Sequence, residues 1–111
     1  LSASYVLNAA RIGRTVSDPR VSGHRVVGST DMGNVSHLVA SIHPMIASAP
    51  HNTAIHTSAF AEHSRGPLAD AAVIDGAKAM ALTAIDFWTS AQMRTAVQAD
   101  FMRANPDKDV L

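Results

Sequence analysis

The sequence contains no cysteine among its 111 residues. A disulfide framework and a thiolate metal site are therefore both excluded. No apolar run approaches the roughly 20 residues that a membrane span requires, so we expect no membrane partner. The chain begins at Leu1 rather than Met, and the residues that follow lack the basic-then-apolar order of a secretory signal. We expect a cytoplasmic protein and a chain cut from something longer.

Charged and aromatic side chains are also few. Nine basic and nine acidic residues give a formal net charge of zero, and only 16% of the residues are charged. Nucleic-acid binding proteins usually carry a basic patch, and no dense cluster of Lys and Arg is present, so we expect no nucleic-acid partner. The hydrophobic fraction of 47% is typical of a packed chain of one small domain.

Three segments have the apolar spacing of helices. Leu1–Ile12 is the first, and Gly13 is placed to end it as a C-terminal cap. The second is the longest and runs from about Leu68 to about Trp88, with Pro67 at the first helical position. The third is Ala91–Ala104.

Two segments favour strands. His37–Ala49 is apolar and β-branched enough for a buried strand, although Pro44 limits its regularity, and the polar loop before it has room for a short strand at Arg25–Val27. The predicted fold class is therefore α/β. Two strands cannot easily cover helices this long, so we expect the helices to lie on a larger mixed sheet whose other strands are absent from this chain.

Six histidines are candidates for metal binding or proton transfer. They are His24, His37, His43, His51, His56 and His63. None of the recognised zinc spacings is present, and a loop histidine is more often exposed or simply hydrogen-bonded than a ligand. Asp31 lies among small residues, a context that permits close approach to a ligand, but its residue type favours an N-cap for the next helical turn.

Four motifs, in this order and spacing, resemble the C-terminal end of one peptidase family. They are Gly28–Ser36, Ile42–Pro44, His56–Phe60 and Gly76–Asp86. The family comprises the co-catalytic zinc amidohydrolases, which include aminoacylases and carboxypeptidase G, and the branch with aminobenzoyl-glutamate hydrolases is the most similar. The resemblance covers about nine-tenths of the chain, whereas any single motif would be a weak signal.

The resemblance implies a zinc-exopeptidase-like catalytic domain, a mixed sheet flanked by helices, interrupted by a lid domain that also forms a homodimer. Residues 1–111 would be the C-terminal fragment of the catalytic domain after the lid insertion. His56 matches the last metal ligand of the family. Ser29, Thr30 and Asp31 match a loop that lies beside the metals and shapes the substrate pocket.

The implied chemistry is hydrolysis of an amide bond in a small molecule, such as an N-acyl amino acid, a dipeptide or an aminobenzoyl-glutamate-like compound. In the family, two divalent ions, commonly zinc, polarise the carbonyl and lower the pKa of a bridging water, and a glutamate acts as general base. The base and the other ligands would lie upstream. We therefore assign no catalytic residue to this chain and expect it to be inactive alone.

Two departures from the family pattern concern loop geometry. Ala40 stands where the family often has proline, and Ser58-Ala59 stands where it often has Pro-Glu. A second hypothesis is a non-catalytic, truncated module of the same fold that acts in structure or partner binding. A third, a histidine-rich metal carrier, is disfavoured because the histidines are scattered along the chain.

Overall fold

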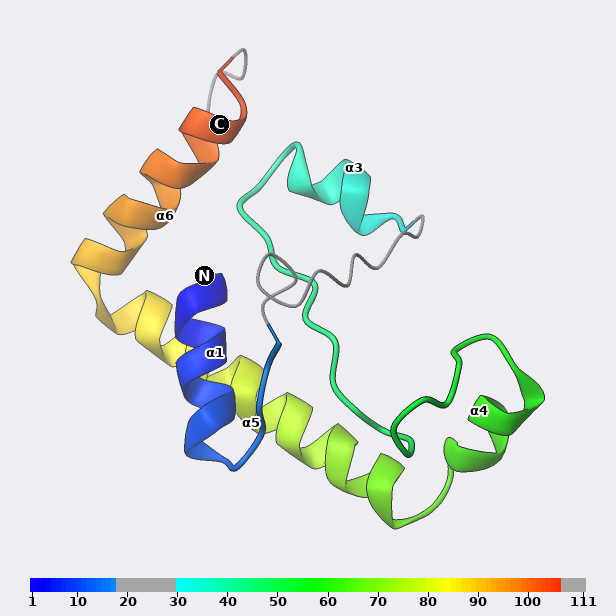
Figure 1. Ribbon diagram of the computed structural model, residues 1–111. Helices are drawn as coiled ribbons and strands as arrows, with labels where there is room; N and C mark the ends of the chain where they lie inside the picture. Colours follow the sequence, from blue (N-terminus) through cyan, green and yellow to red (C-terminus); the bar gives the residue numbers. More distant parts are fainter. Residues whose placement is uncertain (18–29, 107–111) are drawn as a thin grey trace.

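The computed structural model describes residues 1–17 and 30–106, and this part of the chain is all-helical. Helix accounts for 62% of the described residues, and none of them is in a strand. The helices are α1 (Ser2–Arg11), α3 (Met32–Ser36), α4 (Ser58–His63), α5 (Pro67–Thr89) and α6 (Ala91–Ala104) (Figure 1).

The predicted α/β class, with its zinc-exopeptidase-like mixed sheet, is therefore wrong for the described residues. The segment predicted as a strand, His37–Ala49, contains no strand. A strand is stabilised by its ladder to a neighbour, and within residues 1–17 and 30–106 no second extended segment pairs with this one. Pro44 also removes one of the donors that a ladder would use. The other predicted strand, Arg25–Val27, lies outside the described residues.

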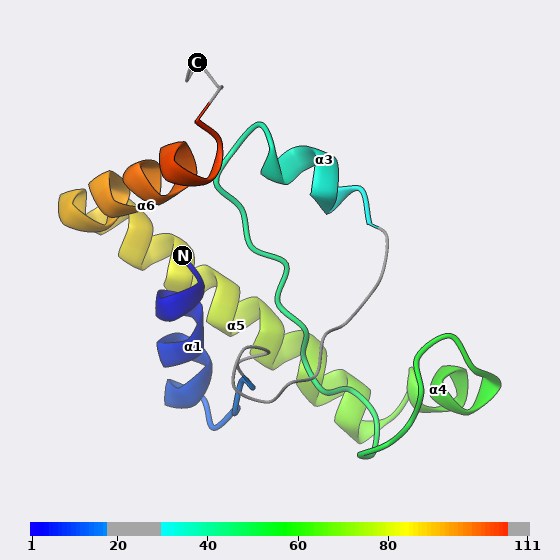
Figure 2. The ribbon, with the colours of Figure 1, turned by 45° about the horizontal axis from the view of Figure 1, so that its top comes forward.

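The three helices predicted from apolar spacing are confirmed as α1, α5 and α6, with bounds within one or two residues of those expected. Pro67 opens α5 at its first position, directly after Gly66, whose φ of 122° only glycine adopts readily. Ser90 separates α5 from α6, and its hydroxyl accepts a hydrogen bond from the Met93 N–H at 3.1 Å. This cap starts a new helix in a new direction, as Figure 2 shows.

The core lies where α1 crosses α5. Tyr5 and Ala9 of α1 pack against Ala79 of α5, and all three are nearly inaccessible to solvent. Alanine at the crossing point lets the two helices approach closely, and the Tyr5 ring then supplies most of the buried apolar area. Ile12 and Ile42 pack around this cluster, so the irregular segment after α3 covers the same core that it was expected to join as a strand.

The predicted cap at Gly13 is confirmed in detail. Gly13 has φ of 80°, its N–H donates to the Ala10 carbonyl at 3.0 Å, and the Arg14 N–H donates to the Ala9 carbonyl at 2.9 Å. These two bonds form a Schellman motif, which satisfies carbonyls at the end of α1. The turn also directs Arg14 back to α5, where its Nε lies 2.8 Å from an Asp75 carboxylate oxygen.

No helix in the described ranges 1–17 and 30–106 is both long enough and apolar enough to cross a membrane.

Candidate functional site

His56 stands in an unusual backbone conformation at the entrance to α4. Its φ is 62°, and Asn52, earlier in the same loop, has φ of 69°. They are the only non-glycine residues with positive φ in the described part of the chain. The Thr57 hydroxyl donates to the Ala54 carbonyl at 2.7 Å and accepts from the Phe60 N–H at 3.2 Å. The turn and the helix cap therefore hold His56 from both sides, with its side chain exposed.

Helix α4 was not predicted, although its sequence carries a signal. Thr57 is the N-cap residue, and its hydroxyl satisfies the N–H three residues on. Threonine before a short run of helix formers is a recognised start signal. Apolar spacing did not predict this helix, because six residues are too few to show a helical period.

The loop predicted to shape a substrate pocket is described only from Thr30 onward, because Ser29 lies outside the described residues. Asp31 occupies the N-cap position of α3, but its carboxylate makes no capping hydrogen bond. The Thr30 hydroxyl instead accepts from the Met32 N–H at 3.4 Å. The Asp31 side chain therefore does not cap the helix. Because Asp31 is also exposed, its carboxylate is available at the surface.

The structure does not bring these residues into one site. Helices α3 and α4 lie apart in Figures 1 and 2, so Thr30 and Asp31 are separated from His56. Among residues 1–17 and 30–106, no three His, Asp or Glu side chains converge on a point where a metal ion could be held. His56 therefore belongs to no group of three candidate ligands in this part of the chain.

The other histidines that the structure describes form no metal site. His37 lies with its Nδ1 3.4 Å from Asn105 Oδ1, and His43, His51 and His63 are exposed. His24 lies outside the described residues. The expectation of surface histidines is confirmed for His37, His51 and His63. His43 was instead expected to be structural or to support a metal ligand, and its exposure does not test that role.

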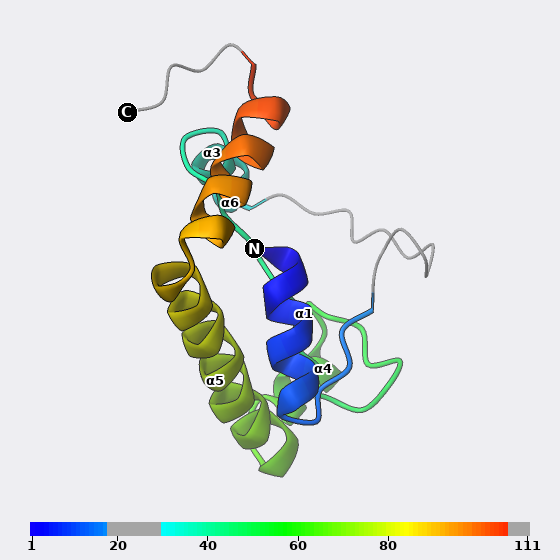
Figure 3. The same ribbon diagram turned by 90° about the vertical axis from the view of Figure 1, so that its left-hand side faces the viewer.

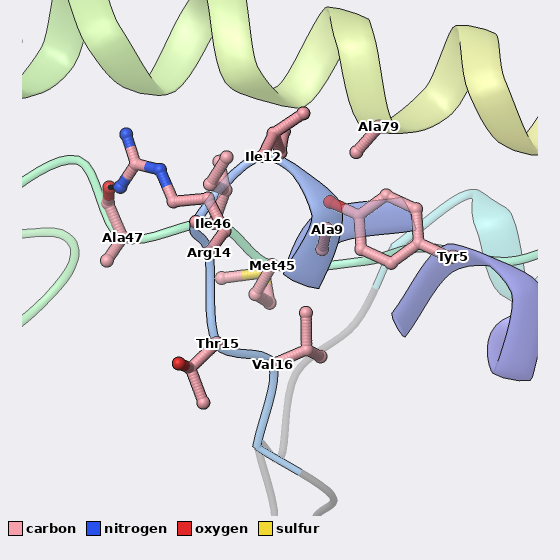
Figure 4. Close-up of a pocket in the computed structure, with 11 residues that line it drawn as sticks. Tyr5, Ala9, Ile12, Arg14, Thr15, Val16, Met45, Ile46, Ala47 and Ala79 are labelled. Carbon is pink, nitrogen blue, oxygen red and sulfur yellow. Dashed lines mark hydrogen bonds between the residues drawn. The ribbon is translucent and has the colours of Figure 1, made fainter. Parts of the chain in front are cut away.

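A cavity of about 270 Å³ lies beside the crossing of α1 and α5 (Figure 4). Its wall is mostly apolar and includes Tyr5, Ile12 and Ile46. Arg14 also lines it, but this guanidinium is already paired with Asp75 and donates to the Ala47 carbonyl at 3.1 Å. No histidine, carboxylate or thiol is part of the lining. The lining therefore offers no histidine or carboxylate for acid–base chemistry and no thiol nucleophile, and its only side-chain hydroxyls are those of Tyr5 and Thr15.

A polar cluster that sequence reasoning missed joins α1 to α5. Asn8 is completely buried, and its Nδ2 donates to an Asp86 carboxylate oxygen at 2.7 Å. The Ser4 hydroxyl donates to the same oxygen at 2.8 Å, and Arg11 donates to Asn8 Oδ1 at 2.8 Å. Hydrogen bonds from Asn8 and then Ser4 lower the pKa of Asp86. Each group is satisfied by another protein group, so the cluster fixes how the helices pack rather than offering a reactive site.

Comparisons with known proteins do not extend these observations. No protein family, curated protein or solved structure matches the chain significantly.

Proposed function

We propose that the protein carrying this chain is a metal-dependent amidohydrolase and that His56 supplies one ligand to a pair of divalent ions, zinc being the expected metal. The substrate would be a small molecule with an amide bond, such as an N-acyl amino acid, a dipeptide or an aminobenzoyl-glutamate-like compound. A cytoplasmic location and a homodimer formed through a lid domain outside this chain are parts of the same proposal.

The observation that carries the proposal is the backbone of His56. A left-handed conformation is uncommon for a residue with a Cβ, and such residues cluster at functional sites, where the surrounding structure holds them in place. Here Thr57 holds the turn through two hydrogen bonds. The imidazole is presented to solvent from a fixed backbone, which is what a metal ligand requires.

The described residues fit one ligand of a metal site and not a complete one. Catalytic zinc takes three protein ligands, and the described residues contain no group of three candidate ligands. The other ligands and the general base would come from parts of the protein outside the described residues. Bound metal would polarise the scissile carbonyl. Ser29, Thr30 and Asp31 are the proposed substrate-binding residues, and because α3 and α4 lie apart in Figure 1, the complete protein would have to bring them to the metal.

The test uses the native protein purified from its source, with its mass, metal content and hydrolysis of N-acyl amino acids measured together. We expect close to two divalent ions per chain, and we expect His56→Ala to lose one ion and about 10²-fold or more of the activity. His63→Ala is the matched control, because His63 is also exposed and lies at the end of the same helix.

Unchanged metal content in His56→Ala would remove His56 from the site. A native protein that holds no divalent ion and hydrolyses no amide would refute the whole proposal.

The second candidate is a non-catalytic module that acts in structure or partner binding. One observation favours it: the side of α5 turned away from α1 is apolar and exposed, with Val73 and Trp88 each about seven-tenths accessible to solvent. Absence of metal and of hydrolysis, together with a stable complex through this face, would select this candidate.

A further inference from the structure

The cavity beside the crossing of α1 and α5 is built from parts of the chain that lie far apart in the sequence. Helix α1, which packs against α5 in Figures 1 and 3, contributes Tyr5 and Ala9, and the turn after it contributes residues 12–16. Residues 45–47 form another wall. The cavity volume is about 270 Å³. Because an apolar cavity of roughly 150 Å³ holds one benzene molecule, this cavity has room for a ligand of about ten non-hydrogen atoms.

The hydroxyl of Tyr5 is the buried polar group that points into this cavity. Tyr5 is only 4% exposed, and Figure 4 shows its hydroxyl directed toward Ile12 and Ile46, in the middle of the lining residues. No group in residues 1–17 and 30–106 forms a hydrogen bond with this hydroxyl, and Figure 4 draws none. A buried tyrosine hydroxyl normally has a partner, and a buried polar group without one lowers stability. A ligand in the cavity would supply this partner.

The rest of the lining favours a neutral ligand. Arg14 is the only charged residue that lines the cavity, and its guanidinium is already paired with Asp75 and donates to the Ala47 carbonyl. The other lining side chains, apart from the Tyr5 and Thr15 hydroxyls, are apolar. A charged ligand would lose its hydration here without meeting a free opposite charge. A mainly apolar molecule with one hydrogen-bonding group fits this lining, as it fits most small-molecule pockets.

The cavity is accessible from the surface. Thr15 and Met45 both line it, Thr15 is exposed, and Met45 is 58% exposed. The cavity therefore reaches solvent where these two residues lie. Methionine is unbranched and adapts its shape to its neighbours, so Met45 can move aside while a ligand enters.

We propose that this cavity binds a small neutral molecule with an apolar body and one carbonyl group, and that the Tyr5 hydroxyl donates a hydrogen bond to this carbonyl. The lining contains no histidine, and α4 lies away from α1 in Figures 1 and 2. The inference therefore goes beyond the proposed amidohydrolase, and it holds or fails independently of His56 and of any metal.

The test is isothermal titration calorimetry of the full-length protein with propiophenone, a neutral aryl ketone of the expected size. We expect saturable binding with a dissociation constant of ~10–300 µM, which is the affinity that ligands of this size reach. The control probe is 2-phenyl-1-butene, which has the same shape but carries a methylene group in place of the carbonyl oxygen. We expect it to bind ~3–10-fold more weakly, because it leaves the Tyr5 hydroxyl without a partner.

The decisive variant is Tyr5→Phe, with Thr15→Val as its matched control. Tyr5→Phe removes the buried hydroxyl and keeps the ring, whereas Thr15→Val removes the other side-chain hydroxyl of the lining. We expect Tyr5→Phe to weaken ketone binding ~3–10-fold and to leave binding of the control probe unchanged, so that the difference between the two probes disappears. Thr15→Val should leave both affinities unchanged. Circular dichroism of both variants checks that their helices are intact.

Three results would overturn the proposal. The first is no saturable binding to the wild-type protein at ~1 mM propiophenone, which would mean that another part of the complete protein fills the cavity. The second is a Tyr5→Phe variant that binds the ketone as tightly as the wild-type protein does. The third is ketone binding that is lost on treatment with a metal chelator or in a folded His56→Ala variant, which would assign the probe to the metal site of the proposed function.

Discussion

Replacing Asn8 with alanine tests the polar cluster that joins α1 to α5. The Asn8 side chain is completely buried, and its amide lies 2.7 Å from Asp86 Oδ2 and 3.4 Å from Thr83 Oγ1. Its carbonyl oxygen accepts from Arg11. One side chain therefore connects two helices that are otherwise joined by a small apolar cluster and by the hydrogen bond from Ser4 to Asp86.

The expected loss is large for so small a protein. A hydrogen bond to a charged group contributes about 1.5–3 kcal/mol and a neutral one about 0.5–1.5 kcal/mol, and truncation also leaves a small cavity. Water reaching the exposed end of the cluster replaces some of these bonds. We therefore expect Asn8→Ala to lower the free energy of unfolding by about 2–4 kcal/mol, a substantial part of the 5–15 kcal/mol typical of small domains.

The assay is urea unfolding followed by far-ultraviolet circular dichroism. Asn34→Ala is the matched control, because Asn34 is also in a helix but is exposed, and we expect its effect to stay within about 0.5 kcal/mol. An Asn8→Ala variant as stable as the Asn34→Ala control would refute the reasoning. It would mean that the apolar contacts and the remaining polar contacts hold α1 on α5 without the Asn8 side chain.

Three further predictions concern other parts of the chain. Gly76→Ala should raise the free energy of unfolding by about 0.5–1 kcal/mol in the same urea assay, because a glycine inside a helix lowers stability. The added Cβ would lie 3.6 Å from Ile46 Cδ1, an ordinary contact distance. A destabilised variant would contradict this. Hydrogen bonds from Asn8 and then Ser4 lower the pKa of Asp86 in the folded state. The ionised carboxylate therefore stabilises the folded protein above the ordinary Asp pKa of about 4, and this stabilisation is lost as the pH falls below that value. The urea midpoint should fall in that acidic range less steeply for Asp86→Asn than for the wild-type chain, and equal slopes would count against the assignment. Thr57→Ala should cost about 0.5–2 kcal/mol locally by removing the cap of α4, seen as faster amide hydrogen exchange in α4 alone, with Thr95→Ala as a control that leaves this exchange unchanged.

The parts of the candidate site differ in how far the sequence predicted them. The resemblance selected His56, and the sequence pattern around it contains the capping threonine, but the positive φ of His56 follows from how the turn closes and is not encoded in any one residue. Asp31 was expected either to line the substrate pocket or to cap the next helical turn, and the structure shows that its carboxylate does not cap α3. The Asn8 cluster could not be predicted, because Asn8 and Asp86 are far apart in the sequence and meet only when the helices pack.

The sequence by itself determined three of the described helices, α1, α5 and α6. Apolar spacing, Pro67 at the start of α5 and Gly13 at the end of α1 are local signals, and local signals act within a few residues of where they stand. Only the tertiary structure decided which conformation His37–Ala49 adopts. An apolar run becomes a strand only when another strand pairs with it, and in the described part of the chain this segment packs on helices instead. The exposure of α5 also depends on tertiary structure, because the sequence predicts a wide apolar face on this helix but only the packing of α1 shows which part of that face is buried and which part is exposed.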